Sequence, residues 1–295
     1  MSRIHVRMRV FSGLRDPEWE ITRPGDVARV QRWFANNAAR RGGRPAGRSE
    51  RDQRAVQPPV TGFRGFDVTM NGRTMRVYRN NLPSLPAAAT SAETIDNILF
   101  STNAEVLARE FGLTPMMMLS DEVHAIDGLP PTCDTSDLEL GSTHYRPSSW
   151  MPDPFCDNTC YGYAANVKTE SVVTPDDSQR QNWSKSELRA ALADDGAGPA
   201  TTAVPSARLD SPDVHYMVAV IQPLVGGRGD FHFLRLDRSG CWSHKVSTDP
   251  VKQVDDQDKK LTNLCQARFR TPFVFVGFFV VNEDLRDLLR ERGQA

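Results

Sequence analysis

The segment that most constrains the fold runs from Thr271 to Val281 and is almost continuously apolar. A run of this length without polar alternation is typical of a β-strand buried on both faces. Three further strand-like segments precede it and are joined by short Gly-containing turns: His215 to Gln222, Phe231 to Leu236 and Cys241 to Lys245. The pattern predicts an antiparallel sheet in which Thr271 to Val281 is the central strand.

The N-terminal part of the chain carries shorter and more mixed patterns. Residues 3–10 alternate basic and apolar side chains with a period of two, which indicates a half-buried strand. The segment from Val27 to Arg40 places its apolar residues on one helical face. Gly62 to Tyr78 is predicted to form a hairpin, because alternating residues flank the favoured two-residue turn Asn71-Gly72.

Together these patterns predict an α+β protein with two parts. We expect a small N-terminal α/β module over residues 1–140 and, over residues 141–295, a domain in which a helix packs on an antiparallel sheet. Residues 1–64 hold fourteen Arg against six acidic residues, and six of these Arg fall within 40–58. That stretch is predicted to be a flexible loop, because its Gly, Pro, Ser and Gln cannot form a core. It lacks the interleaved aromatic residues that stack on bases, so nucleic acid is disfavoured as a partner.

The sequence shows neither a transmembrane segment nor a signal peptide. No apolar run is long enough to cross a bilayer, and residues 1–7 lack the apolar centre of a signal peptide. The default expectation is therefore a cytoplasmic protein, with signal-free secretion left open. The sequence does not indicate an oligomeric state.

Cysteine usage favours free thiols. The chain has five cysteines, an odd number, and it is long enough to fold without a disulfide framework. Cys156 and Cys160 are four residues apart, a spacing that would also permit a redox pair or, with two histidines, a zinc site. The zinc alternative is disfavoured because no second compact pair of ligands is present. No metal or cofactor is predicted.

One cysteine and two histidines form the candidate catalytic set. Cys160 stands where a loop is predicted to pass into a helix, and His232 and His244 follow in two strand-like segments. A helix N-terminus and a nearby imidazolium both favour thiolate over thiol, and the thiolate is the nucleophile. Cys160 is thus predicted to attack, His232 to act as base and then acid, and His244 to orient His232. Asn158 or Tyr161 would lie near the oxyanion.

The register of one hairpin decides whether the two histidines meet. If three residues form the loop, Leu236 pairs with Gly240, and His232 faces His244 on the same side of the sheet. A two-residue loop would place the two imidazoles on opposite faces. His215, at the start of a hydrophobic strand, is the alternative base.

Several segments of the chain resemble motifs of a poorly characterised group of bacterial and invertebrate proteins. The matching segments are Phe11-Ser12-Gly13-Leu14-Arg15-Asp16-Pro17-Glu18-Trp19, Asp157 to Ala164, Asp230 to Arg235, and Trp242-Ser243-His244-Lys245. They are similar to Phe-Ser-Gly-Arg-Pro-Asn-Pro-x-Trp, Asn-Asn-Cys-Tyr-Asn-Tyr-Ala, Asp-Tyr-His-Trp-Tyr-Arg and Trp-Ser-His-Lys in that group. The chain departs from these motifs at Thr159, where the group has Asn, and at Val246-Ser247, where it has Pro-Gly. The order Cys, His, His also resembles that of papain-like thiol hydrolases, which implies a papain-like fold for the second domain.

These observations support one leading function and two alternatives. The leading hypothesis is a thiol hydrolase, an amidase or peptidase that cleaves an amide bond in a peptide or peptidoglycan-like, cell-wall-like substrate. The main alternative is a non-catalytic binding or structural protein in which Trp150, Trp242 and the histidines form a carbohydrate-binding or protein-binding surface. The third is an effector or antitoxin-like protein that binds a partner through the Arg-rich loop, with strong salt dependence.

Overall fold

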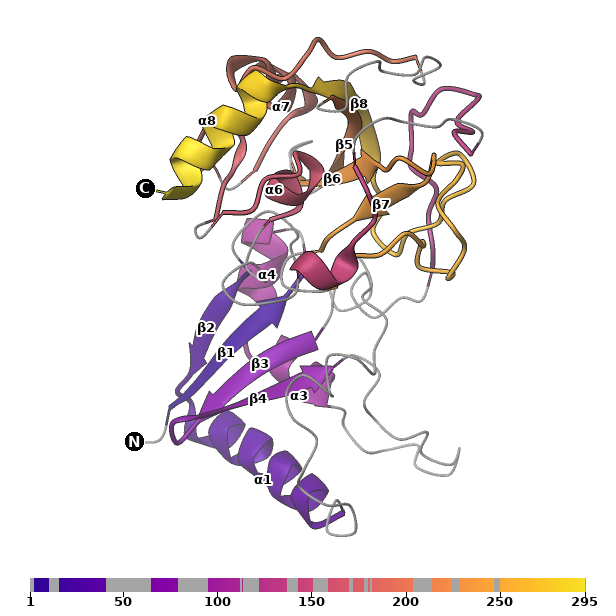
Figure 1. Cartoon of the computed structure of the whole chain (residues 1–295). Helices are drawn as coiled ribbons and strands as arrows, with labels where there is room; N and C mark the ends of the chain where they lie inside the picture. The colour runs from indigo at the N-terminus through magenta and orange to yellow at the C-terminus, as the bar shows by residue number, and fades with distance from the viewer. Residues whose placement is uncertain are drawn as a thin grey trace. The chain divides into compact units, whose positions relative to one another are not determined.

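The computed structural model describes residues 3–10, 16–40, 65–78, 95–111, 113, 122–136, 143–150, 159–169, 172–177, 180, 182–203, 214–223, 229–246 and 250–294. The described residues up to Leu113 form one compact unit, and those from Glu122 onward form a second (Figure 1). Most of the Arg-rich loop at 40–58 lies outside the described residues. None of the described helices is long and apolar enough to cross a membrane.

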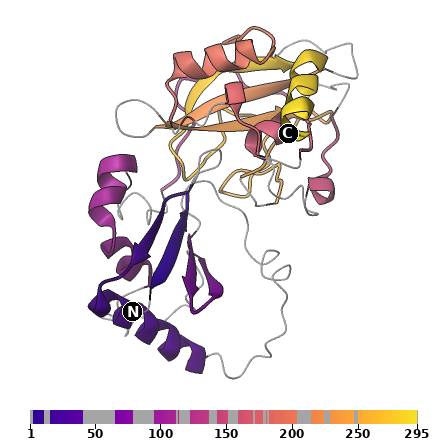
Figure 2. The same ribbon diagram turned by 90° about the vertical axis from the view of Figure 1, so that its left-hand side faces the viewer.

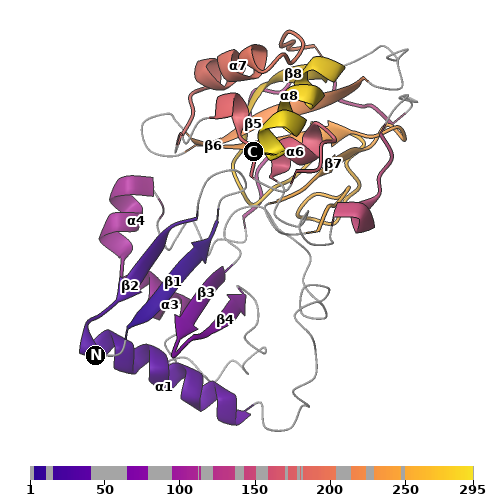
Figure 3. The ribbon, with the colours of Figure 1, turned by 60° about the vertical axis from the view of Figure 1, so that its left-hand side comes forward.

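In its described part, the first unit is a four-stranded antiparallel sheet with three helices. The strands lie in the order β2-β1-β3-β4, and the helices follow β2 and β4 in the chain (Figure 3). The elements are β1 (Ile4–Arg9), β2 (Glu18–Ile21), α1 (Pro24–Arg40), β3 (Gly65–Met70), β4 (Arg73–Tyr78), α3 (Ile95–Ser101) and α4 (Ala104–Phe111). The predicted hairpin is confirmed over residues 65–78, where Asn71 and Gly72, at φ 50° and 74°, join β3 to β4.

Period-two alternation gives this sheet one buried face. Val6 and Met8 of β1 are fully buried beside Phe66 of β3, whose ring lies 5.3 Å from that of Phe100 in α3. His5 and Arg7 of β1 point to the other face, where each lies near Glu18 of β2. The strand predicted at residues 3–10 is therefore present with the expected polarity.

The second unit is also built on a four-stranded antiparallel sheet, in the order β7-β6-β5-β8. Its strands are β5 (His215–Pro223), β6 (Gly229–Leu236), β7 (Trp242–His244) and β8 (Val274–Val281). The apolar run at 271–281 thus supplies an edge strand, whereas the sequence predicted a central one. β8 is still buried, because residues 198–201 cover its outer edge through hydrogen bonds to Phe278 and Val280.

Helices cover one face of this sheet and irregular segments cover the other. The described helical elements of the unit are η1 (Pro147–Trp150), α6 (Cys160–Ala164), η3 (Pro175–Asp177), α7 (Lys185–Asp194) and α8 (Glu283–Gln294) (Figures 1 and 2). Buried residues of α6, α7 and α8 form one core with Met217, Phe231 and Phe233 of the sheet. A second core on the opposite face contains Leu234 and Trp242, packed on Phe269 and Phe273 of the segment before β8. The chain is α+β, as predicted.

The division between the units falls before residue 122, earlier than the boundary predicted near residue 140. The reason is that residues 122–136 are bonded to residues of the second unit. His124 forms a β-bridge with Phe269, and Cys133 is disulfide-bonded to Cys265. The sequence of this irregular segment contains no periodic pattern that would assign it to either sheet.

Candidate functional site

Cys160 lies where the sequence placed it, at the first residue of a helix. Thr159 is the N-cap of α6, and its Oγ1 accepts a hydrogen bond of 3.3 Å from the Gly162 backbone N–H. Cys160 is fully buried, and its Sγ donates to the Phe231 carbonyl at 3.9 Å. Burial raises the pKa of the Cys160 thiol far above its usual range, and the nearby Asp230 carboxylate raises it further. The thiol is therefore protonated at neutral pH, the reverse of the thiolate expected from sequence.

The two histidines of the candidate set do meet. His232 Nε2 lies 2.9 Å from His244 Nδ1, and both residues are fully buried. The register differs from the one expected: Leu236 pairs with Trp242, so five residues connect β6 and β7. This register is shifted by two residues from the expected one, and a shift of two leaves every side chain on its original face. His244 Nε2 donates to the Val254 carbonyl at 3.3 Å, and burial lowers the pKa of His244 well below its usual value.

Cys160 does not join this histidine pair. Phe231 and Phe233 pack in the core that contains Cys160, so His232, between them, faces the opposite side of β6. There its ring stacks on Phe273 at a centroid distance of 5.3 Å. Among the described residues, no imidazole nitrogen lies within hydrogen-bonding distance of Cys160 Sγ. The predicted nucleophile and its predicted base are thus separated by the sheet.

The other residues proposed for catalysis have structural contacts. His215 is on the same face as α6, but its Nε2–H donates to the Ala164 carbonyl at the end of that helix, at 2.6 Å. Tyr161 Oη donates to Asp195 Oδ2 at 2.7 Å, and this buried hydroxyl has a pKa raised by burial and by Asp195. Asn158 lies outside the described residues, as does Cys156.

His215 makes the stability of the fold depend on pH. Burial lowers its pKa from 6.5 to about 3, so the folded state holds it neutral while the unfolded state takes up a proton below pH 6.5. Its contribution to stability is complete above pH 6.5 and is lost as the pH falls towards 3. In the wild-type protein, this effect lowers the free energy of unfolding as the pH falls from 6 to 4. We expect the fall to be smaller in His215→Gln, by about 1.4 kcal/mol per pH unit.

This expectation is checked by urea denaturation at several pH values. Met217→Leu, in the same strand and core, is the control, because it perturbs packing without removing a titrating group. An unchanged pH slope in His215→Gln would contradict a neutral buried imidazole at this position.

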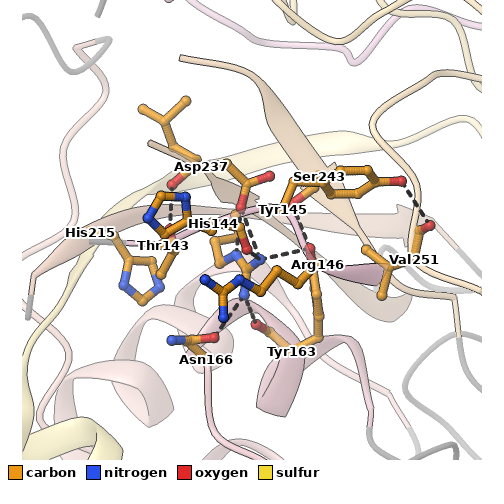
Figure 4. Close-up of polar contacts among 12 residues, drawn as sticks. Thr143, His144, Tyr145, Arg146, Tyr163, Asn166, His215, Asp237, Ser243 and Val251 are labelled. Carbon is orange, nitrogen blue, oxygen red and sulfur yellow. Dashed lines mark hydrogen bonds and ion pairs between the residues drawn. The ribbon is translucent and has the colours of Figure 1, made fainter. Parts of the chain in front are cut away.

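Sequence analysis did not single out Arg235, a polar side chain of the second unit with several hydrogen-bond partners. Arg235 follows Phe231 and Phe233 on the same face of β6 and is fully buried. Its Nε and Nη2 each lie 2.9 Å from Asp237 Oδ1, and its guanidinium carbon lies 4.2 Å from the centre of the Tyr163 ring. The labelled side chains of Tyr163, Asn166 and Asp237 converge in Figure 4. A charged residue on the same strand face as Phe231 and Phe233 was the available signal.

Arg235 also joins two irregular segments. Its Nη2 donates to the His144 carbonyl at 3.4 Å, and its Nη1 donates to Asn166 Oδ1 at 3.0 Å. Tyr163 Oη, which accepts from Arg235 at 3.0 Å, lies 2.6 Å from Ser243 Oγ. The buried guanidinium of Arg235 therefore connects the segments 143–150 and 166–168.

These two segments line an open pocket of about 510 Å³. The described lining residues are His144, Arg146, Ser149, Trp150, Asn166 and Lys168, none of them acidic. Lys168 Nζ lies 5.6 Å from the centre of the Trp150 ring, and Trp150 packs edge-on against Tyr163 at 5.0 Å. Trp150, which the binding alternative placed in a surface, is at this pocket although only 3% of it is exposed. Trp242, the other tryptophan of that alternative, is fully buried in the core and forms no surface.

The cysteines depart from the expectation of free thiols. Cys133 and Cys265 form a disulfide, whereas Cys160 and Cys241 are free and buried. Within the described part of the chain, no group of three or more His, Cys, Asp or Glu side chains is arranged to hold a metal ion.

Comparison with known proteins finds a relative of the chain, but neither a protein-family model nor a solved structure that matches it. The insoluble matrix shell protein 1 of Ruditapes philippinarum is 32% identical to the chain over 120 residues. The matched region covers 39% of this chain and 74% of that protein.

Proposed function

Since the chain belongs to the family of the insoluble matrix shell protein 1, we propose that it is a non-catalytic binding and structural protein of an extracellular matrix. The relative's name describes a protein of a shell matrix, which is an extracellular material. The disulfide between Cys133 and Cys265 supports this location, because disulfides persist mainly in oxidising compartments. The proposal replaces the cytoplasmic default with the secretion that the sequence analysis left open.

The observation that carries the non-catalytic part is the environment of Cys160. Thiol hydrolysis requires a thiolate with a base in hydrogen-bonding reach. Here the thiol is fully buried, has a raised pKa, and donates to a backbone carbonyl. This geometry favours a core cysteine over a nucleophile, so the thiol-hydrolase hypothesis, with its peptide or peptidoglycan-like substrate, becomes the less favoured one.

Alkylation of the folded protein tests this assignment. We expect iodoacetamide at pH 8 to leave Cys160 unmodified in the folded protein and to modify it fully in denaturant, because a buried protonated thiol is inert. Peptide mass spectrometry resolves Cys160 from Cys241, and glutathione in the same reaction confirms that the reagent is active. Rapid modification of Cys160 at pH 6 to 7 in the folded protein, suppressed by His232→Ala, would restore the hydrolase hypothesis.

The binding part of the proposed function is assigned to the pocket beside Trp150. It is a concave site whose two segments are both hydrogen-bonded to Arg235, and it combines an aromatic residue with several polar side chains. Pockets of this size are typical of small-ligand sites.

A further inference from the structure

We propose that the pocket formed by His144, Arg146, Ser149, Trp150, Asn166 and Lys168 binds an acidic sugar unit, one that carries a carboxylate or a sulfate group. This inference deepens the proposed function and rests on it, because it names the ligand of a matrix-binding protein. The charge of the lining, the direction of its hydrogen-bonding groups and the size of the cavity each favour such a ligand.

The charge of the lining favours an anion. Arg146 and Lys168 are exposed cations of the lining, one from each of its two segments, and no described carboxylate pairs with the Arg146 guanidinium. Arg238 adds a third cation beside the pocket, where its Nη1 lies 3.5 Å from His144 Nε2. The positive charge of Arg235 beneath the pocket is already balanced by Asp237. Among the described lining residues, the charged side chains presented to a ligand are therefore all cationic.

Asn166 shows which way the neutral hydrogen-bonding groups point. Its Oδ1 accepts from the buried Arg235, and this fixes the orientation of the side-chain amide. The amide nitrogen is left on the other branch as a donor, and no described residue accepts from it. Asn166 adopts φ 59°, a left-handed conformation that asparagine tolerates better than most residues. The amide is thus held in place before a ligand arrives, which reduces the entropic cost of binding.

The remaining features favour a sugar over an acidic peptide. A cavity of about 510 Å³ is larger than a bare carboxylate or sulfate requires and has room for a sugar ring. Ser149 Oγ donates to the Arg146 carbonyl at 2.9 Å and keeps lone pairs that can accept from a sugar hydroxyl. A peptide that binds by strand addition needs the free edge of a strand. The described lining contains no strand, only the segments 143–150 and 166–168.

Binding of defined oligosaccharides to the full chain tests the inference. Isothermal titration calorimetry is performed at low salt with a tetragalacturonate, a sulfated tetrasaccharide, neutral maltotetraose and a tetra-aspartate peptide. We expect one or both acidic oligosaccharides to bind, with the uronate and the sulfated ligand separating the two anionic groups, and maltotetraose not to bind. Arg146→Ala should weaken the affinity by about tenfold or more, because it removes a charge-assisted hydrogen bond. Lys185→Ala, which removes an exposed cation at the start of α7, should leave the affinity unchanged.

Three results would overturn the inference. These are binding of neither acidic oligosaccharide, equal affinity of Arg146→Ala and the wild type, and tighter binding of tetra-aspartate than of both sugars. The last result would assign the pocket to an acidic protein. Each leaves the proposed function intact as long as Cys160 is inert to alkylation, whereas a reactive Cys160 contradicts the proposed function whatever the pocket binds.

Discussion

Replacing Arg235 with methionine is expected to lower the free energy of unfolding by about 3–5 kcal/mol. The guanidinium is fully buried and pairs with Asp237, whose side chain is 1% exposed. Methionine fills similar space but leaves the Asp237 carboxylate in the interior without its cation. Gln253 Nε2, at 2.9 Å from Asp237 Oδ2, is a neutral donor and cannot replace that charge. Urea denaturation at pH 7 measures the change.

The control for this experiment is an ion pair of the same chemistry at the surface. Arg290 pairs with Glu283 on α8, and about half of each side chain is exposed. Arg290→Met should therefore cost less than about 1 kcal/mol. Adding Asp237→Asn to Arg235→Met should recover part of the loss, because it removes the orphaned charge. A loss in Arg235→Met no larger than that in Arg290→Met would show that the buried pair does not stabilise the unit.

Several regular elements of this fold were predictable because each of them carries its own periodic pattern. The hairpin around Asn71-Gly72 needs two residues with positive φ, and the sequence supplies the two residue types best suited to it. The position of β8 was not predictable in the same way. An apolar run indicates that a strand is buried. It does not indicate whether the strand pairs with another strand or with an irregular segment at its edge. In this chain, residues 198–201 pair with the outer edge of β8.

Only the part of the candidate site that depends on the alternation of side chains along strands was predictable from the sequence. His232 and His244 share a face because a register shift of two residues preserves it. The separation of Cys160 from this pair depends on which face α6 covers, and that is a property of tertiary packing that no local pattern encodes. The same packing explains Arg235. Its side chain follows the phenylalanines toward α6, where Tyr163 and Asn166 supply its partners.

Loss of the disulfide between Cys133 and Cys265 is expected to lower the free energy of unfolding by about 2–5 kcal/mol. The two cysteines are 132 residues apart in the chain, so the bond greatly restricts the unfolded state. Cys133→Ala, Cys265→Ala and the double variant should lose nearly the same amount, because each removes the same bond. Denaturant titration without a reducing agent measures all three, and reduction of the wild-type protein should reproduce their loss.

A buried free thiol separates this effect from the loss of side-chain packing. Cys241 is 3% exposed and unpaired, so Cys241→Ala removes a comparable side chain without opening a covalent loop. If Cys133→Ala and Cys265→Ala each cost no more than Cys241→Ala, or if their losses add in the double variant, the bond does not constrain the chain. A large shared loss would instead mean that the second unit reaches full stability only in an oxidising compartment, where the disulfide is kept, as the proposed extracellular role requires.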